Sequence, residues 1–125
     1  MGKVLVVEDN ELNMKLFYDL LTIQHHEIII SRDGVGVVEI ALSQKPDLIL
    51  MDIQLNGVSG IDLISALKVN KQTSHIPIIA ITAFAMKQDE AKISKSGCDM
   101  YLSKPVSIDS FFKAIQKFIP PSNGI

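Results

Sequence analysis

The chain has 125 residues, of which 47% are hydrophobic and 21% charged, and its formal net charge is −2. These values predict one soluble, globular domain and exclude a disordered chain. The charge balance lacks the basic excess of a nucleic-acid binder, so we expect no binding to nucleic acid.

A single cysteine, Cys98, excludes an intramolecular disulfide and favours a reducing compartment, which we take to be the cytoplasm. The first three residues lead directly into a short apolar run, so no signal peptide is recognised. The longest apolar stretch, residues 76–86, has 11 residues and is interrupted by Thr82. Because a helix that crosses a bilayer needs about 20 apolar residues, we expect no insertion into a membrane.

Five short apolar runs along the chain predict β-strands. The first, third and fourth are nearly continuous in apolar residues and do not alternate with polar ones. This pattern is typical of strands buried on both faces, as in a parallel sheet covered by helices. In chain order, the predicted strands are residues 3–7, 27–31, 47–51, 77–81 and 99–103.

Longer runs with a helical period separate these strands, and Asn10 and Ser107 are expected to cap the first and last helix. The run over residues 86–96 is the most polar. We expect only Ala91 and Ile93 to point inward there, so this helix is predicted to be either shallowly docked or mobile. The apolar stripes of the other four helices are Met14, Phe17, Leu20 and Leu21; Val37, Val38, Ala41 and Leu42; Ile61, Ile64 and Leu67; and Phe111, Phe112, Ile115, Phe118 and Ile119.

Strands that alternate with helices imply right-handed β-α-β crossovers and a parallel sheet. Five such units in one small domain predict an α/β, flavodoxin-like three-layer sandwich. Its five-stranded parallel sheet should have the order 2-1-3-4-5 and be covered by five helices. In such sheets the functional site lies beyond the carboxyl ends of the strands, so the residues that follow each strand are the candidates for chemistry.

Charged and hydroxyl side chains follow four of the predicted strands. Glu8 and Asp9 follow the first strand and Asp52 the third, while Thr82 follows the fourth and Lys104 the fifth. Because strands one, three and four are predicted neighbours, these residues should converge. Adjacent carboxylates repel one another unless a cation lies between them, and hard oxygen ligands suit Mg²⁺ or Mn²⁺. With a hydroxyl and a lysine beside them, the carboxylates indicate a site for moving a phosphoryl group onto an aspartate.

Taken singly, each of these residues has a plainer, structural explanation. The acids at positions 8 and 9 favour a helix N-terminus, and Asp52 is also typical of a turn before Gly57. Tyr101 on its own is more often a core residue whose hydroxyl reaches water. However, an acid after an unbroken apolar strand is costly to bury, and the second acidic pair makes a shared site the better hypothesis.

Four motifs at the predicted strand ends, in this order, resemble those of the receiver domain of two-component response regulators, the CheY-like family. The resemblance covers residues 3–119. The sequence around the motifs, at residues 8–16, 51–55 and 82–87, is most similar to receivers that act alone in bacterial cell-cycle and division control. The motifs are Val-Val-Glu-Asp-Asn at residues 6–10, Asp-Leu-Ile-Leu-Met-Asp at 47–52, Ile-Thr-Ala at 81–83 and Tyr-Leu-Ser-Lys-Pro at 101–105.

The resemblance implies that Asp52 is the phospho-acceptor, which would form a 4-aspartylphosphate. It implies Glu8, Asp9, Asp52 and the backbone carbonyl of Gln54 as the ligands of Mg²⁺. The chain departs from the family at Asn56, where receivers commonly carry proline, and this departure concerns the loop after Asp52.

Three further positions receive a role from the resemblance. Thr82 matches the switch hydroxyl that bonds the phosphoryl group, and Tyr101 matches the aromatic residue whose rotamer follows it. Lys104 matches the lysine that binds the phosphoryl group, and its bond to Pro105 is cis in the family.

The implied function is that of a response regulator in a two-component system or phosphorelay. It would accept a phosphoryl group from a histidine kinase or histidine phosphotransferase and would not be an enzyme beyond its own phosphoryl transfer and autodephosphorylation. It would signal by phosphorylation-dependent contacts with a downstream protein, as a monomer or weak dimer without an output domain. The receiver is expected over residues 1–119 and a disordered tail over residues 120–125.

Other functions fit parts of this pattern. A Mg²⁺-dependent phosphatase of the haloacid dehalogenase type also uses an Asp after a strand, but it usually needs a second Asp where this chain has Gln54. A flavodoxin-type FMN carrier would need a Ser/Thr/Gly-rich phosphate loop in place of Glu8 and Asp9, which would repel the phosphate. A shuttle receiver within a multistep phosphorelay is a third alternative.

Overall fold

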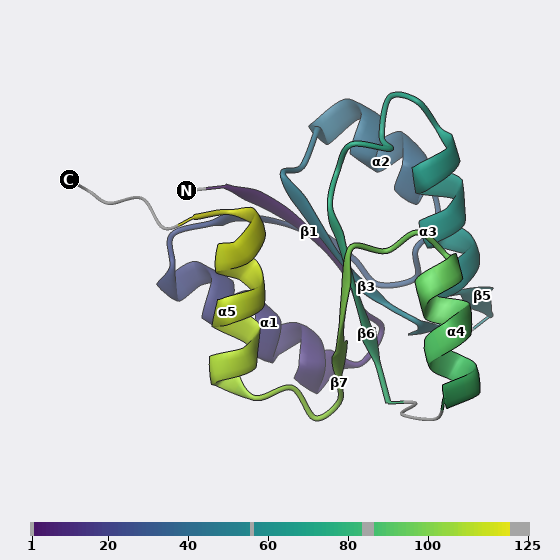
Figure 1. Cartoon of the computed structure of the whole chain (residues 1–125). Coiled ribbons are helices and arrows are strands. Elements are labelled where there is room, and N and C mark those ends of the chain that lie inside the picture. The colour runs from purple at the N-terminus through teal and green to yellow at the C-terminus, as the bar shows by residue number, and fades with distance from the viewer. Residues whose placement is uncertain (1, 56, 84–86, 121–125) are drawn as a thin grey trace.

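A five-stranded parallel β-sheet lies at the centre of the computed structural model (Figure 1). The structure describes residues 2–55, 57–83 and 87–120, with residues 87–89 described by their backbone alone. The strand order is β2-β1-β3-β6-β7, which is the predicted order 2-1-3-4-5 once the short strands β4 and β5 are set aside. The predicted α/β, flavodoxin-like architecture is therefore confirmed. The five strands are β1 Lys3–Val7, β2 Glu27–Ser31, β3 Leu48–Asp52, β6 Ile78–Thr82 and β7 Met100–Ser103.

Two candidate functional residues are the last residues of their strands. Asp52 ends β3 and Thr82 ends β6, one residue beyond each predicted boundary. Parallel pairing explains this extension, because Asp52 is in register with Ile81 of β6 and Thr82 with Ser103 of β7. Both side chains are therefore held by the sheet itself and not by a loop.

Helices cover both faces of the sheet, two on one side and three on the other (Figure 1). Successive side chains of a strand point to opposite faces, so the continuous apolar strands supply both cores at once. All five residues of β3 and of β6 are buried, as the sequence predicts. The helices are α1 Glu11–Ile23 and α5 Ile108–Phe118 on one face, and α2 Val37–Gln44, α3 Gly60–Val69 and α4 Lys87–Lys95 on the other.

The two helices on the first face begin and pack as predicted. The Asn10 side chain accepts the N–H of Asn13 at 3.0 Å, and the Ser107 hydroxyl accepts the N–H of Ser110 at 3.1 Å. Each cap satisfies a backbone donor that the first turn of a helix leaves unpaired. The predicted stripe of α1 is buried in full: Met14, Phe17, Leu20 and Leu21.

Helix α4 differs from the prediction at one of its two inward candidates. Ile93 is buried, but Ala91 is exposed, so the expectation for Ala91 was wrong. Ile93 is the one buried residue among residues 90–95, the part of α4 whose side chains the structure describes. A second tie comes from β7, where the Tyr101 hydroxyl donates to Glu90 Oε1 at 3.1 Å. A single buried side chain among these described residues agrees with shallow docking of α4, and the mobility of the helix stays a prediction.

A two-stranded antiparallel hairpin, β4 Gln54–Leu55 and β5 Val58–Ser59, follows β3 and was not predicted. Strands this short carry no periodic signal. The turn between them includes Gly57 at φ 77°, a conformation that glycine adopts without strain. Asn56, the predicted departure from the family, lies outside the described residues.

Within the described part of the chain, no helix combines the length and the apolar character needed to cross a membrane. Of the predicted tail, residues 121–125 lie outside the described residues.

Candidate functional site

Three carboxylates meet at the carboxyl end of the central strands. Glu8 and Asp9 follow β1, and Asp52 ends the neighbouring strand β3. One carboxylate oxygen from each lies within 4.8 Å of the other two. Glu8 and Asp52 are buried and Asp9 is half-buried. The structure thus brings together the three acids that the strand order places side by side.

Lys104 brings a positive charge to this group from the edge of the sheet. Its Nζ lies 3.2 Å from Asp52 Oδ2 and 3.5 Å from Glu8 Oε1. Its backbone N–H donates to the Thr82 carbonyl at 2.7 Å, which ties the segment after β7 to the end of β6. The bond to Pro105 is cis. One ammonium facing three carboxylates leaves the site short of positive charge.

Backbone N–H groups hold one oxygen of each buried acid. Asp52 Oδ1 accepts the N–H of Gln54 at 2.9 Å, and Glu8 Oε2 accepts the N–H of Asn10 at 3.1 Å. Glu8 Oε1 is buried and accepts no hydrogen bond from the part of the chain that the structure describes, and its ionic contact is with Lys104 Nζ at 3.5 Å. A buried carboxylate oxygen without a hydrogen bond is only partly compensated for its desolvation, so a further cation would stabilise it.

These observations fit a hard divalent cation. The three candidate ligands are carboxylate oxygens, two of them from buried groups, and the buried Glu8 Oε1 accepts no hydrogen bond from the described residues. Mg²⁺ prefers such oxygen ligands and keeps several waters, for which the half-buried Asp9 leaves the site open on one side.

The pKa of Glu8 is raised from 4.5 to about 7, first by burial and then by its contact with the Asp52 carboxylate. Proximity of Lys104 and the hydrogen bond from Asn10 oppose this rise without cancelling it. Near neutral pH, Glu8 is therefore divided between its protonated and ionised forms when no cation is bound.

This raised pKa predicts a pH-dependent stability of the metal-free chain. The folded state holds a proton on Glu8 that the unfolded chain releases near pH 4.5, so the contribution is complete below that pH and is lost as pH rises through about 7. We expect the free energy of unfolding to fall by on the order of 2 kcal/mol across this window. Glu8→Gln should remove most of this slope.

Urea unfolding with a chelator at a series of pH values measures this effect. Glu39→Gln, at an exposed position on α2, is the matched control and should keep the wild-type slope. Added Mg²⁺ should bind more weakly as pH falls below about 7, because the proton competes for the same carboxylate. A Glu8→Gln chain with an unchanged slope would contradict this explanation.

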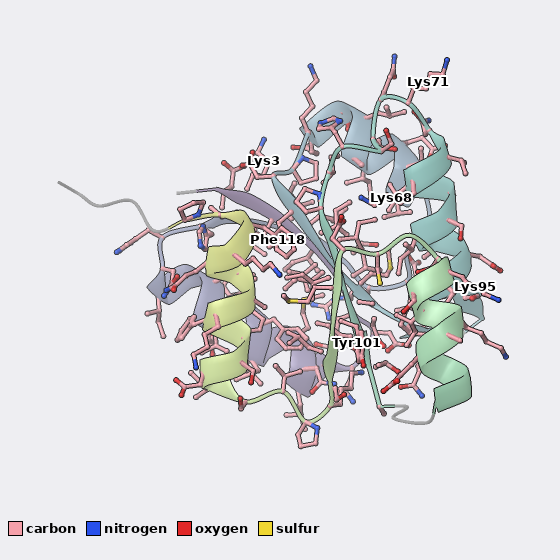
Figure 2. The ribbon with its side chains drawn as sticks, viewed as in Figure 1. Lys3, Lys68, Lys71, Lys95, Tyr101 and Phe118 are labelled. Carbon is pink, nitrogen blue, oxygen red and sulfur yellow. The ribbon has the colours of Figure 1, made fainter. Side chains whose placement is uncertain are left out.

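Thr82 and Tyr101, the two predicted switch residues, occupy neighbouring strands but different environments. Thr82 is fully buried at the end of β6, whereas Tyr101 on the edge strand β7 is 37% exposed (Figure 2). The hydrogen bond that Tyr101 donates to Glu90 raises the pKa of its phenol. Tyr101 therefore connects β7 with α4 in this structure.

Sequence reasoning missed two features that shape the site. The side chain of Gln54 accepts the N–H of Ala83 at 3.0 Å, although only its backbone carbonyl was considered. Gly60, the first residue of α3, packs so closely on β3 that a Cβ atom would lie 2.3 Å from the Asp52 carbonyl oxygen. In the sequence, the glycine after Ser59 indicates only a flexible backbone. The sequence does not reveal which strand this glycine packs against.

Residues 4–116 match the response regulator receiver domain, and the chain therefore belongs to this family of signalling proteins. The resemblance of the four motifs is thus confirmed. The polar-differentiation response regulators DivK of Brucella anthropi, Brucella ovis and Brucella suis are each 49% identical to it over 116 residues, 93% of this chain and 94% of theirs.

Solved structures show the same fold. The receiver domain of the sensor histidine kinase PA1611 from Pseudomonas aeruginosa has a TM-score of 0.86 and 29% identity, over 94% of this chain and 97% of that chain. Its crystal structure holds a magnesium ion in the active-site cleft. The chemotaxis protein CheY4 of Vibrio cholerae has a TM-score of 0.87 at 22% identity, over 94% and 98% of the two chains.

Proposed function

We propose that this receiver takes a phosphoryl group onto Asp52 with the help of Mg²⁺ and signals through the change that follows. The observation that carries the proposal is the contact of Lys104 with two buried carboxylates: its Nζ lies 3.2 Å from Asp52 Oδ2 and 3.5 Å from Glu8 Oε1. The magnesium ion in the active-site cleft of the related PA1611 receiver supports a magnesium site here, for which the proposed ligands are Glu8, Asp9, Asp52 and the backbone carbonyl of Gln54.

The reaction needs a nucleophilic carboxylate oxygen and a stabilised phosphoryl group. An Asp52 oxygen attacks phosphorus, and the bond from phosphorus to the donor breaks with its electron pair leaving on acetate or on an imidazole nitrogen. Lys104 attracts a phosphoryl oxygen, and the N–H of Gln54 fixes the orientation of the carboxylate. When bound, Mg²⁺ would neutralise part of the negative charge on the phosphoryl and carboxylate oxygens.

Incubation with acetyl phosphate and Mg²⁺, followed by intact mass measurement, tests the proposal without a protein partner. We expect the mass of one phosphoryl group to be added and the addition to disappear with chelator. Acetyl phosphate turnover without an adduct would favour the phosphatase alternative. Membership of the receiver family argues against that alternative. No adduct and no turnover under any divalent cation would refute the proposal.

The exposed face of α1 supports a helical partner that delivers the phosphoryl group. Leu12 is 79% and Leu16 is 36% exposed, and they are four residues apart, so they share one side of a helix that begins two residues after Asp9. We infer that a histidine kinase or histidine phosphotransferase docks on this face. Burial of exposed apolar side chains such as these favours association.

The double variant Leu12→Ala/Leu16→Ala should therefore separate the two kinds of donor. We expect its labelling by acetyl phosphate to match the wild type and its labelling by a phosphohistidine-carrying donor protein to slow by about tenfold or more. Ile23→Ala, at the other end of α1, is the control and is 65% exposed in the wild type. If labelling by both donors slowed equally, the substitutions would have damaged the phosphorylation site itself and not the docking of the donor protein.

The face formed by α4, β7 and α5 is the proposed output surface, since Tyr101 ties its strand to α4. We expect Tyr101→Ala to leave labelling of Asp52 unchanged. Hydrogen exchange of residues 90–96 should change on phosphorylation in the wild type but hardly in this variant, because the β7–α4 tie is then absent in both states. Tyr101→Phe, which removes only the hydroxyl, should behave in the same way. A wild-type-like difference in both variants would assign the switch to another element.

The DivK relatives, named for polar differentiation, support a role in bacterial cell-cycle or division control. The proposal includes a cytoplasmic protein, monomeric or weakly dimeric, that does not bind nucleic acid and passes its signal to a downstream protein. A shuttle role in a multistep phosphorelay is distinguished by transfer of the phosphoryl group from Asp52 to a second histidine-containing protein.

A further inference from the structure

Gln54 contacts the candidate phospho-acceptor and the end of the neighbouring strand at the same time. Its backbone N–H donates to Asp52 Oδ1 at 2.9 Å, while its side-chain Oε1 accepts the N–H of Ala83 at 3.0 Å. Gln54 begins β4 just after β3, and Ala83 follows the last residue of β6. One residue therefore connects the two segments that leave the central strands.

The Ala83 N–H is a backbone donor on the same rim as Asp52. Asp52 is in register with Ile81, so Ala83 stands two residues beyond that pair on the carboxyl side. Ala83 is exposed, and its present acceptor is a neutral carboxamide. This N–H can therefore change its acceptor without leaving a buried group unpaired.

A phosphoryl group on Asp52 would compete for this donor. It adds three strong acceptor oxygens and a charge of about −1.5 to −2. Lys104 Nζ, 3.2 Å from Asp52 Oδ2, can donate a hydrogen bond to one of these oxygens. Hydrogen bonds to a charged acceptor are roughly twice as strong as those between neutral groups. A phosphoryl oxygen is thus the stronger acceptor for Ala83 than the Gln54 carboxamide.

We propose that Gln54 is a positioning residue whose carboxamide holds the Ala83 N–H while Asp52 is unmodified and yields it to a phosphoryl oxygen afterwards. This inference rests on the proposed function, because it requires the phosphoryl group to be on Asp52. The exchange frees the Gln54 side chain and ties Ala83, just after the end of β6, to the modified Asp52.

Gln54→Met tests the exchange, because methionine keeps the length of the side chain and has no carbonyl acceptor. Gln54→Glu is the matched control, since it keeps an acceptor oxygen and adds a negative charge. The probe is beryllium fluoride with Mg²⁺, a tetrahedral mimic of a phosphoryl group on a carboxylate. Two quantities are measured: the hydrogen exchange of the Ala83 amide by NMR, and the affinity for the probe by titration.

In the free chain, we expect the Ala83 amide to exchange faster in Gln54→Met than in the wild type and in Gln54→Glu. Affinity for the probe should rise by about twofold to tenfold in Gln54→Met, because binding no longer breaks the Gln54 hydrogen bond. It should fall in Gln54→Glu, whose carboxylate holds the N–H more strongly and repels the probe. With the probe bound, the Ala83 amide should have the same chemical shift in the wild type and in Gln54→Met.

The possible failures are distinct. If the wild type takes neither the probe nor a phosphoryl group, the proposed function fails and this inference fails with it. If the probe binds but the three chains have equal affinities, or the wild-type Ala83 amide does not respond, Gln54 has only a structural role and the inference alone is overturned. A general loss of structure would instead lower the melting temperature of Gln54→Met, which the same samples report.

Discussion

Asp52→Asn is expected to abolish labelling by acetyl phosphate while the fold and its metal-free stability are kept or improved. The amide that replaces the carboxylate is not a nucleophile, so the adduct should fall to background. Stability should not suffer, because the change removes one of three carboxylates that meet within 4.8 Å of one another. Lys104 keeps Glu8 as an ionic partner in the variant.

Intact mass and thermal unfolding of the same samples measure both parts of this prediction. Asp62→Asn, at an exposed position in the first turn of α3, is the control and should label like the wild type. Undiminished single-site labelling of Asp52→Asn would assign the phosphoryl group to another residue. A large fall in metal-free melting temperature would show that the Asp52 carboxylate stabilises the fold, contrary to the repulsion argument.

Gly60→Ala is expected to be among the most destabilising single substitutions in the chain. The added Cβ would lie 2.3 Å from the Asp52 carbonyl oxygen and 2.6 Å from Ile53 Cα, and both of these are backbone atoms of the central sheet region. To relieve this clash, α3 or the end of β3 must move, so we expect the free energy of unfolding to fall by about 3 kcal/mol or more. The movement should also slow labelling of Asp52.

Gly36→Ala separates this clash from the general cost of replacing a glycine. Gly36 has a φ of 70° but no atom closer than 3.9 Å to the added Cβ, so its substitution should cost only about 1–2 kcal/mol. Chemical unfolding of the two variants gives the comparison. Equal losses would mean that the close approach of Gly60 to β3 relaxes freely.

The central strands could be predicted from the sequence because burial on both faces leaves a continuous apolar signal, as in residues 78–81. The hairpin of β4 and β5 could not, since strands of two residues carry no periodic signal. Ala91 was placed inward because it is one of few apolar residues in that run. It is exposed because residues two apart on a helix point to different sides, and Ile93 takes the buried side.

The acids of the site were predictable because strand order alone brings Glu8, Asp9 and Asp52 to one edge of the sheet. The distances from Lys104 to two of them, and the hydrogen bond between Gln54 and Ala83, depend on side-chain directions that no spacing encodes. Glutamine after a strand is also common in ordinary turns, so the sequence offers no signal for its second contact.

Chemical trapping can locate the phosphoryl group on a single residue of the chain. The chain is incubated with acetyl phosphate and Mg²⁺ and then treated with borohydride, which reduces an acyl phosphate and converts the modified aspartate to homoserine. Peptide mass spectrometry then identifies the reduced residue. We predict homoserine at position 52 alone, and none when chelator is present. Reduction at Asp9, or a phosphoryl group found on a histidine or serine instead, would contradict the account.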